Sequence, residues 1–135
     1  MGSASGGDIN LTGVWQGLYS YESIQEPVPF MATVLDTGNF ISGATHENCL
    51  VGGLRHGAPT AMIDGNRRAL HVSFTKKYDG SEGWDHAVVY DGDATPDGTE
   101  IVGRWILPEG LTGYFLMVRD ARKAQEIWVK RFVEA

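Results

Sequence analysis

The chain has 135 residues, enough for one domain that buries roughly two thirds of its unfolded surface. Its 18 glycines and 42% hydrophobic residues, without long helical runs, favour an all-β domain of short elements joined by tight turns. The formal net charge of -6, with Lys and Arg scattered along the chain, argues against nucleic acid and anionic membrane as partners, because both are bound through clustered positive charge.

The N-terminal residues MGSASGGD have neither the basic start nor the apolar region of a signal peptide. No stretch approaches the roughly 18 apolar residues that a transmembrane helix needs. We therefore expect residues 1–9 to be a disordered lead, residues 10–135 to form a single domain, and the protein to be cytoplasmic. Cys49 is the single cysteine, which excludes an internal disulfide and a metal-binding cysteine pair.

Alternation of apolar and polar residues with a period of two predicts eight strands. The first places Trp15 between two glycines and its aromatic residues on one face. Most connections carry turn-forming residues, in the runs DTGN, DGNRR, YDGSEG, TPDGT and LPEGL at 36–39, 64–68, 78–83, 95–99 and 107–111. The predicted strands span residues 11–22, 28–36, 39–47, 60–64, 70–78, 84–91, 100–107 and 112–119.

The LPEGL turn sets the register of the last hairpin. The runs LPEGL and TPDGT contain the tripeptides PEG and PDG, in which Pro comes first and Gly third. This order suits a type I turn closed by a left-handed glycine. Large residues then face glycines across the ladder, as the inner face of a small barrel requires. The DTGN loop fits two or three residues, and this choice decides which face of strand 39–47 points inward. The expected pairs are Leu107 with Leu111, Trp105 with Gly113, Gly103 with Phe115, and Ile101 with Met117.

Two further segments follow different patterns. Residues 48–59 form the one long connection, which is either a lid across a barrel mouth or a surface loop. After Arg119, apolar residues at helical spacing behind Asp120 predict a C-terminal helix. The alternation in EIWVKRF leaves a ninth strand as the alternative.

The G-x-W of the first strand, the eight short strands joined mainly by hairpins, and the Arg that ends the last strand resemble the calycin superfamily of lipocalin-like, fatty-acid-binding-like and avidin-like barrels. The residues that carry the resemblance are Gly13, Trp15 and Arg119. It implies a single eight-stranded antiparallel up-and-down barrel, in which Arg119 covers the ring of Trp15 near the closed end. These two residues are then structural, and a ligand-binding role is the alternative.

The chain departs from lipocalins in lacking disulfides, a signal peptide and some length. The run GVWQG also resembles the start of nitrobindin-like haem barrels. Trp105, Leu107 and Arg119 on the late strands offer no axial ligand, however, so we expect no cofactor.

If the candidate side chains all point into the barrel as predicted, the interior is apolar and contains a few polar end groups. Such an interior fits a small, partly aromatic molecule, with any anionic group held by Lys76 or Arg119. The alternative is a fully packed core in which both cations are structural. The candidate ligand-binding residues are Trp15, Tyr19, Phe74, Lys76, Tyr78, Tyr90, Trp105, Phe115, Met117 and Arg119.

Other chemistry has weaker support. No histidine has a histidine partner two or four positions away, so we expect no metal site from His46, His56, His71 and His86. The run DGDATPDG at 91–98 is better explained as a solvated turn than as a calcium loop. Motifs for a nucleophile or a phosphate loop are absent. If the protein is an enzyme, the set to test is Glu47, Tyr78, Tyr90 and Arg119.

We therefore predict an all-β calycin-like barrel with a short C-terminal helix that binds a small hydrophobic or aromatic ligand in its interior. One alternative is a cofactor-free isomerase, cyclase or lyase that uses inward Tyr, Glu and Arg. Another is a filled barrel that serves as an interaction or oligomerisation module. A homodimer is also expected, unless the helix covers the apolar outer face formed by Val102, Tyr114, Leu116 and Val118.

Overall fold

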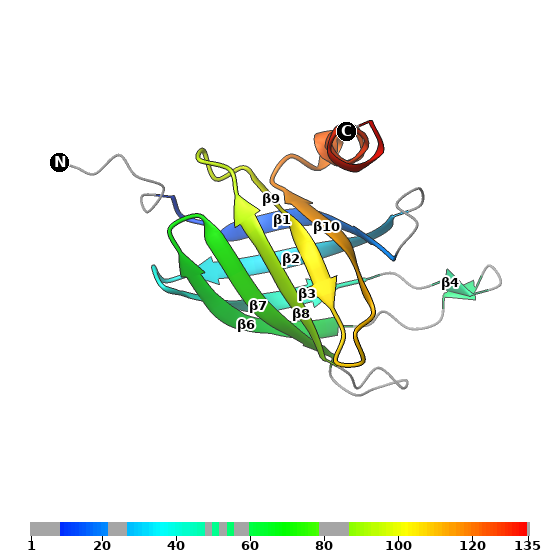
Figure 1. The fold of residues 1–135 in the computed structure, drawn as a ribbon, viewed down its shortest axis with the longest axis horizontal. Coiled ribbons are helices and arrows are strands. Elements are labelled where there is room, and N and C mark those ends of the chain that lie inside the picture. The colour runs from blue at the N-terminus through cyan, green and yellow to red at the C-terminus, as the bar shows by residue number, and fades with distance from the viewer. Residues whose placement is uncertain are drawn as a thin grey trace.

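The computed structural model describes residues 9–21, 27–47, 50–51, 54–55, 60–78 and 87–134. Eight antiparallel strands close into an up-and-down barrel in the order β1-β10-β9-β8-β7-β6-β3-β2, with β1 paired to both β2 and β10 (Figure 1). The strands are β1 (Gly13–Ser20), β2 (Val28–Asp36), β3 (Phe40–His46), β6 (Thr60–Arg68), β7 (His71–Tyr78), β8 (Ala87–Ala94), β9 (Glu100–Ile106) and β10 (Thr112–Val118).

The fold class predicted from the sequence is confirmed. Inside the long connection, β4 (Leu50–Val51) and β5 (Leu54–Arg55) pair with each other in a two-stranded sheet separate from the barrel. The rest of the segment expected to be a lid, and the YDGSEG turn beyond Tyr78, lie outside the described residues. Among the described residues, no helix combines the length and apolar character needed to cross a membrane.

The register predicted for the last hairpin is confirmed. Trp105 pairs with Gly113, Gly103 with Phe115, and Ile101 with Met117. The turn closes through hydrogen bonds from the Leu107 amide to Leu111 O (2.8 Å) and from the Gly110 amide to Leu107 O (2.9 Å). Gly110 has a φ of 99°, the left-handed conformation expected from its place in the turn.

The DTGN turn is a two-residue hairpin. Asp36 pairs with Ile41, and the Thr37 amide donates to Phe40 O at 3.0 Å. This register turns Ile41, Thr45 and Glu47 into the barrel, where all three are buried.

The turn expected within DGNRR at 64–68 is wrong. β6 continues through Arg68, and the reversal occurs at Ala69, which has a φ of 55°. Gly65 pairs with Phe74 of β7, and a Cβ on this glycine would overlap the backbone of the neighbouring strand. Its role is therefore to allow close packing inside the barrel and not to form a turn.

One end of the barrel is closed by the segment that precedes β1. Leu11 is fully buried, and its carbonyl accepts the indole N–H of Trp15 at 2.9 Å. The Arg119 guanidinium lies 4.4 Å from the centroid of the Trp15 ring and donates to the carbonyl oxygens of Asn10, Thr12 (3.0 Å) and Gly98 (2.9 Å). The placement of Arg119 over Trp15 is as the sequence resemblance implied, and it has a structural purpose.

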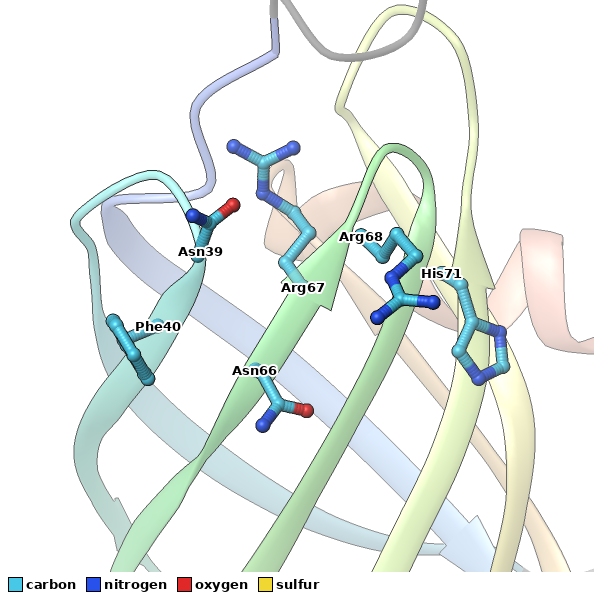
Figure 2. A pocket seen from close by; sticks show the side chains of 6 residues that line it. All are labelled: Asn39, Phe40, Asn66, Arg67, Arg68 and His71. Atoms are coloured by element: carbon cyan, nitrogen blue, oxygen red, sulfur yellow. The ribbon is translucent and has the colours of Figure 1, made fainter.

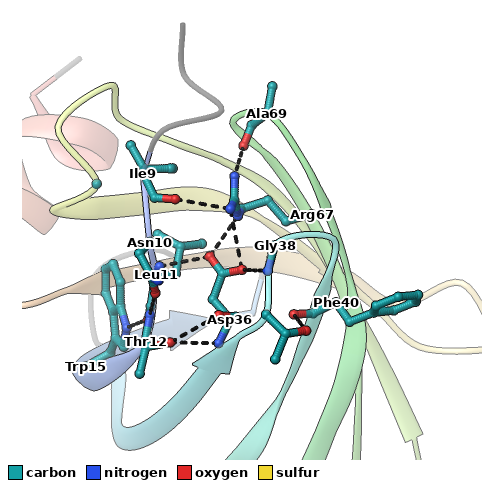
Figure 3. A network of polar contacts seen from close by, with 12 residues as sticks. Ile9, Asn10, Leu11, Thr12, Trp15, Asp36, Gly38, Phe40, Arg67 and Ala69 are labelled. Carbon is teal, nitrogen blue, oxygen red and sulfur yellow. Dashed lines mark hydrogen bonds and ion pairs between the residues drawn. The ribbon is translucent and has the colours of Figure 1, made fainter. Parts of the chain in front are cut away.

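A buried ion pair holds the same segment as well (Figure 3). Arg67 Nε lies 2.8 Å from Asp36 Oδ2, which also accepts the Leu11 amide at 2.9 Å. Arg67 donates further to the carbonyl oxygens of Ile9 (3.1 Å) and Ala69 (2.8 Å). Each polar group of the pair is thus bound by the chain's own backbone, and Ile9, at the end of the lead, packs against the core.

The chain ends in a short helix of 13 residues, as predicted, and the ninth-strand alternative is wrong. It is a 3-10 turn over Ala121–Lys123, then α1 (Ala124–Trp128), then a π turn over Val129–Val133. The Asp120 side chain accepts the Arg122 amide at the helix start.

The helix packs against β1 and β10, where it forms a second hydrophobic cluster outside the barrel (Figure 1). Trp128 is fully buried in this cluster, among Leu18, Leu116, Val118 and Ala124, with Val102 and Tyr114 packed beside them. The apolar outer face on which the expectation of a homodimer rested is therefore covered by the helix.

Trp128→Ala should destabilise the fold by about 3–5 kcal/mol, because it removes the largest side chain between helix and barrel. Val133→Ala is the matched control on the same helix, since Val133 is 50% exposed; it should change the unfolding free energy by less than about 0.5 kcal/mol. Urea unfolding measures both, and equal losses would contradict the packing of this helix.

Candidate functional site

The end of the barrel opposite Arg119 holds a pocket of about 90 Å³. It lies where β1, β7 and β9 end and β8 begins. Among the described residues that line it, Val88 and Leu107 are aliphatic and the others are aromatic. These residues are Tyr19, Tyr21, Tyr78, Val88, Tyr90, Trp105 and Leu107.

The residues predicted to bind a ligand lie at four places in the barrel. Tyr19, Tyr78, Tyr90 and Trp105 line the pocket. Lys76 is buried directly beneath it, while Arg119 lies at the closed end with Trp15. The remaining members are core residues that fill the barrel between these two ends, namely Phe74, Phe115 and Met117.

Three aromatic rings at the mouth stand nearly perpendicular to one another. The Tyr21 and Trp105 ring centroids are 5.1 Å apart with an interplanar angle of 84°, and Tyr19 meets Trp105 at the same angle over 6.4 Å. Trp105 is held in place by its indole N–H, which donates to Ser20 O at 2.8 Å. Edge-to-face rings of this kind form fixed apolar walls.

The floor of the pocket contains a buried carboxylate. Glu47 follows β3, and its side chain is 1% exposed. Tyr19 donates to Glu47 Oε1 at 3.1 Å, and Tyr78 donates to Glu47 Oε2 at 2.5 Å. Lys76 Nζ lies 2.8 Å from the same Oε2 and donates to the Tyr90 hydroxyl at 3.3 Å. One carboxylate at the end of β3 thus binds side chains of β1 and β7, and two of them, Tyr19 and Tyr78, also line the pocket.

The Lys76 ammonium is surrounded by aromatic rings as well. Its Nζ lies 4.7 Å from the Phe30 centroid and between 5.2 and 5.4 Å from the centroids of Tyr19, Tyr78 and Tyr90. Ring faces and edges at this distance compensate part of the hydration that the buried amine loses.

Burial governs the ionisation of this cluster. Desolvation raises the pKa of Tyr78 and of Tyr19 far above the usual value, and the nearby Glu47 carboxylate raises both further. Desolvation likewise raises the pKa of Tyr90. Burial lowers the pKa of Lys76, and the attraction of Glu47 opposes this shift. The phenols are therefore neutral hydrogen-bond donors.

The Asp36 carboxyl at the closed end behaves differently. Burial alone would raise its pKa, but hydrogen bonds from the Leu11 and Gly38 amides and from Arg67 hold the pKa below the usual 3.8. This pair is bound on all sides by backbone groups, so it has a structural role.

Thr45 is the one buried side chain in the described part of the chain whose oxygen has no hydrogen-bond partner. It lies on the inner face of β3, two residues before Glu47 and between Ala32 and Ala61 of the neighbouring strands. An unpaired buried hydroxyl is costly, so this position suits a buried water.

A larger concavity of about 670 Å³ lies on the outer surface of β3, β6 and β7 (Figure 2). Two of its lining side chains already bind carboxylates: Arg67 binds Asp36, and His71 contacts Asp91 at 2.8 Å and Asp93 at 3.2 Å. The other lining residues, apart from the exposed Phe40, are Asn39, Asn66 and Arg68. We therefore place the candidate site at the barrel mouth, where buried polar groups converge.

The part of the chain that the structure describes contains no group of three or more residues able to hold a metal ion. His46 is exposed on β3, and His56 and His86 lie outside the described residues. Asp91 and Asp93 belong to β8 and face His71, whereas Asp97 lies in the following turn and binds Thr95 and Thr99. The three aspartates of the DGDATPDG run are therefore not arranged around one point.

Four residues of this site are absent from the predicted binding residues: Tyr21 and Leu107 at the rim, Val88 in the wall, and Phe30 beside Lys76. Glu47 belongs only to the set predicted for an enzyme, and the Arg119 of that set lies at the opposite end of the barrel. The length of the DTGN loop is the sequence feature that predicts the position of Glu47, because a two-residue loop turns its side chain into the barrel.

Comparison with known proteins supports the fold alone. No family model matches the chain, and no curated protein matches it. A solved structure described as a redesigned beta barrel is similar, with a TM-score of 0.64 and 11% sequence identity over 82% of this chain and 91% of that chain. The barrel fold is thus shared with a redesigned protein, and nothing about ligands follows from the likeness.

Glu47→Gln and Lys76→Met should each destabilise the fold by about 3–5 kcal/mol, because each leaves a buried charge without its partner. The double variant should recover most of this loss, since both charges are then gone. Lys77→Met on the outer face of β7 is the control, with less than about 0.5 kcal/mol expected. Additive losses in the double variant, measured by urea unfolding, would contradict the coupling.

Alkaline titration followed by phenolate absorbance should show three of the five tyrosines protonated in the folded protein well above the usual pKa of 10.0. In denaturant, all five should titrate near this value. Since the unfolded chain releases these protons first, the three phenols make the unfolding free energy fall as pH rises above about 10. Equal titration of the two states would be inconsistent with the buried network.

Proposed function

We propose that the protein is a calycin-like binding barrel that takes a small, neutral, hydrophobic or aromatic molecule into the pocket at its open end. The observation that carries the proposal is the aromatic pocket built directly over the Glu47 network. A well-packed structural core has no need for hydroxyl and charged groups at this place, whereas binding sites commonly combine apolar walls with a few converging polar groups. The placement of Arg119 over Trp15 supports the calycin-like part of the proposal.

The size of the pocket restricts the ligand. Its volume of about 90 Å³ is smaller than sites for drug-sized molecules, which run from roughly 300 to 1,000 Å³. The ligand is therefore about one ring in size, or a larger molecule that projects out of the mouth past Tyr21, which is 53% exposed.

The charges of the site restrict its chemistry. Glu47 neutralises Lys76 at 2.8 Å, so the lysine is not free to hold an anion. Arg119 lies at the other end of the barrel, where its guanidinium donates to three carbonyl oxygens and lies over the Trp15 ring. The ligand we propose is accordingly neutral, with one hydroxyl or carbonyl group that replaces or joins the hydrogen bonds of the Tyr19 and Tyr78 hydroxyls.

Binding of phenol, benzyl alcohol, indole and benzoate is measured by isothermal titration calorimetry. The neutral compounds should bind more tightly than benzoate. Leu107→Trp should weaken their binding at least about tenfold by filling the mouth, because Leu107 lines the pocket.

Ile106→Trp is the matched control, since Ile106 precedes Leu107 on the outer face and is 41% exposed. It should leave binding unchanged. Preferential binding of benzoate, or equal effects of the two tryptophan variants, would overturn the proposed site.

A further inference from the structure

Lys76 is the residue of the site whose presence is hardest to explain by binding or packing alone. It is 1% exposed on the inner face of β7, where the preceding inward positions are Val72 and Phe74. A buried ion pair contributes little net stability compared with apolar side chains of similar volume. The other lysines, Lys77, Lys123 and Lys130, are all exposed.

We propose that Lys76 is the attachment point for a small aldehyde, which enters the mouth pocket and condenses with the lysine amine to form an imine. This inference rests on the proposed function, because it requires that the pocket admit a small ligand. It adds the class of ligand, the carbonyl compounds, and a covalent step.

The position of the amine suits such a ligand. Tyr19, Tyr78 and Tyr90 line the pocket, and each of their ring centroids lies between 5.2 and 5.4 Å from Lys76 Nζ. The amine therefore lies beneath the pocket, separated from it by the rings of these tyrosines. Tyr19 is only partly buried, and its hydrogen bond to Glu47 is 3.1 Å long, so rotation of this side chain is the route by which a carbonyl group reaches Nζ.

The partners of the amine supply the proton transfers that imine formation needs. Glu47 Oε2, 2.8 Å from Nζ, takes a proton from the ammonium, and the neutral amine attacks the aldehyde carbon to form a carbinolamine. Glu47 then returns the proton to the carbinolamine hydroxyl, which leaves as water. The nitrogen loses its remaining extra proton to the carboxylate as the C=N bond forms. One amine and one aldehyde thus give one imine and one water, without an oxidant or reductant.

The surroundings favour this reaction at Lys76 over the exposed lysines. Loss of hydration lowers the pKa of the Lys76 amine, which increases the share of the nucleophilic neutral form. The apolar walls also hold an aromatic aldehyde near the amine and limit the water that would hydrolyse the imine.

The test is reductive trapping of the full-length protein with benzaldehyde and sodium cyanoborohydride, followed by intact mass measurement and peptide mapping. At limiting aldehyde, Lys76 should carry a benzyl group at least tenfold more often than Lys77, its exposed neighbour. Lys77→Arg should leave the labelling of Lys76 unchanged. Leu107→Trp, or excess benzyl alcohol as a non-carbonyl competitor, should reduce the labelling of Lys76 several-fold.

Variants test the role of the partners. Glu47→Gln is destabilised because it leaves Lys76 unpaired, so its labelling is compared at an equal folded fraction; there it should slow labelling of Lys76 while benzyl alcohol still binds. Tyr19→Ala should speed labelling by opening the route. Because Lys76→Met leaves Glu47 unpaired, the double variant Glu47→Gln with Lys76→Met is the folded form that should lose the specific label.

The outcomes separate the two proposals. Benzyl alcohol binding at the mouth together with labelling spread evenly over Lys77, Lys123 and Lys130 would overturn the imine and leave the proposed function standing. Absence of both binding and specific labelling would overturn both proposals. Specific labelling of Lys76 that neither benzyl alcohol nor Leu107→Trp reduces would overturn the route through the pocket.

Discussion

The width of a closed eight-stranded barrel is the constraint on which the rest of this structure depends. Such an interior has room for side chains only when large residues at one level face small ones. Gly113 leaves the space occupied by the Trp105 ring, and Gly17 leaves the space occupied by Phe30, since a Cβ on either glycine would overlap that ring. The packing of the interior and the position of the remaining pocket both follow from where these glycines occur.

The two ends of the barrel use buried charge in different ways. At the closed end, the Asp36 and Arg67 side chains bind backbone amides and carbonyl oxygens of the segment that closes the barrel, so the pair fixes the chain path. At the open end, the described partners of Glu47 are side chains, and those of Tyr19 and Tyr78 also line a pocket. Side-chain partners can exchange hydrogen bonds with a ligand without unfolding the barrel, which is why the open end is the candidate site.

The sequence predicted the parts of the fold that local chemistry determines. The Pro and Gly of LPEGL set the hairpin register around Trp105, and helical spacing after Asp120 predicted the terminal helix. It failed where the same residue types serve packing, as at Gly65, whose run with Asp64 has the form of a turn but lies inside β6. The site was predicted in part: the inward aromatic residues follow from strand parity. The contact of Glu47 with Lys76 does not, because β6 lies between their strands and the DTGN register was open.

The cations inside the barrel already have partners within the chain. Among the described residues, Arg67 is neutralised by Asp36, Lys76 by Glu47, and Arg119 is surrounded by carbonyl oxygens and the Trp15 ring. An anion bound to Arg67 or Lys76 would have to displace Asp36 or Glu47 and leave that buried carboxylate unpaired, at a cost of several kcal/mol. The neutral carbonyl compound that we propose would avoid this cost, because its binding leaves both carboxylates paired with their cations. The ion pair that makes the interior unsuitable for anions is therefore the same feature on which the proposed imine depends.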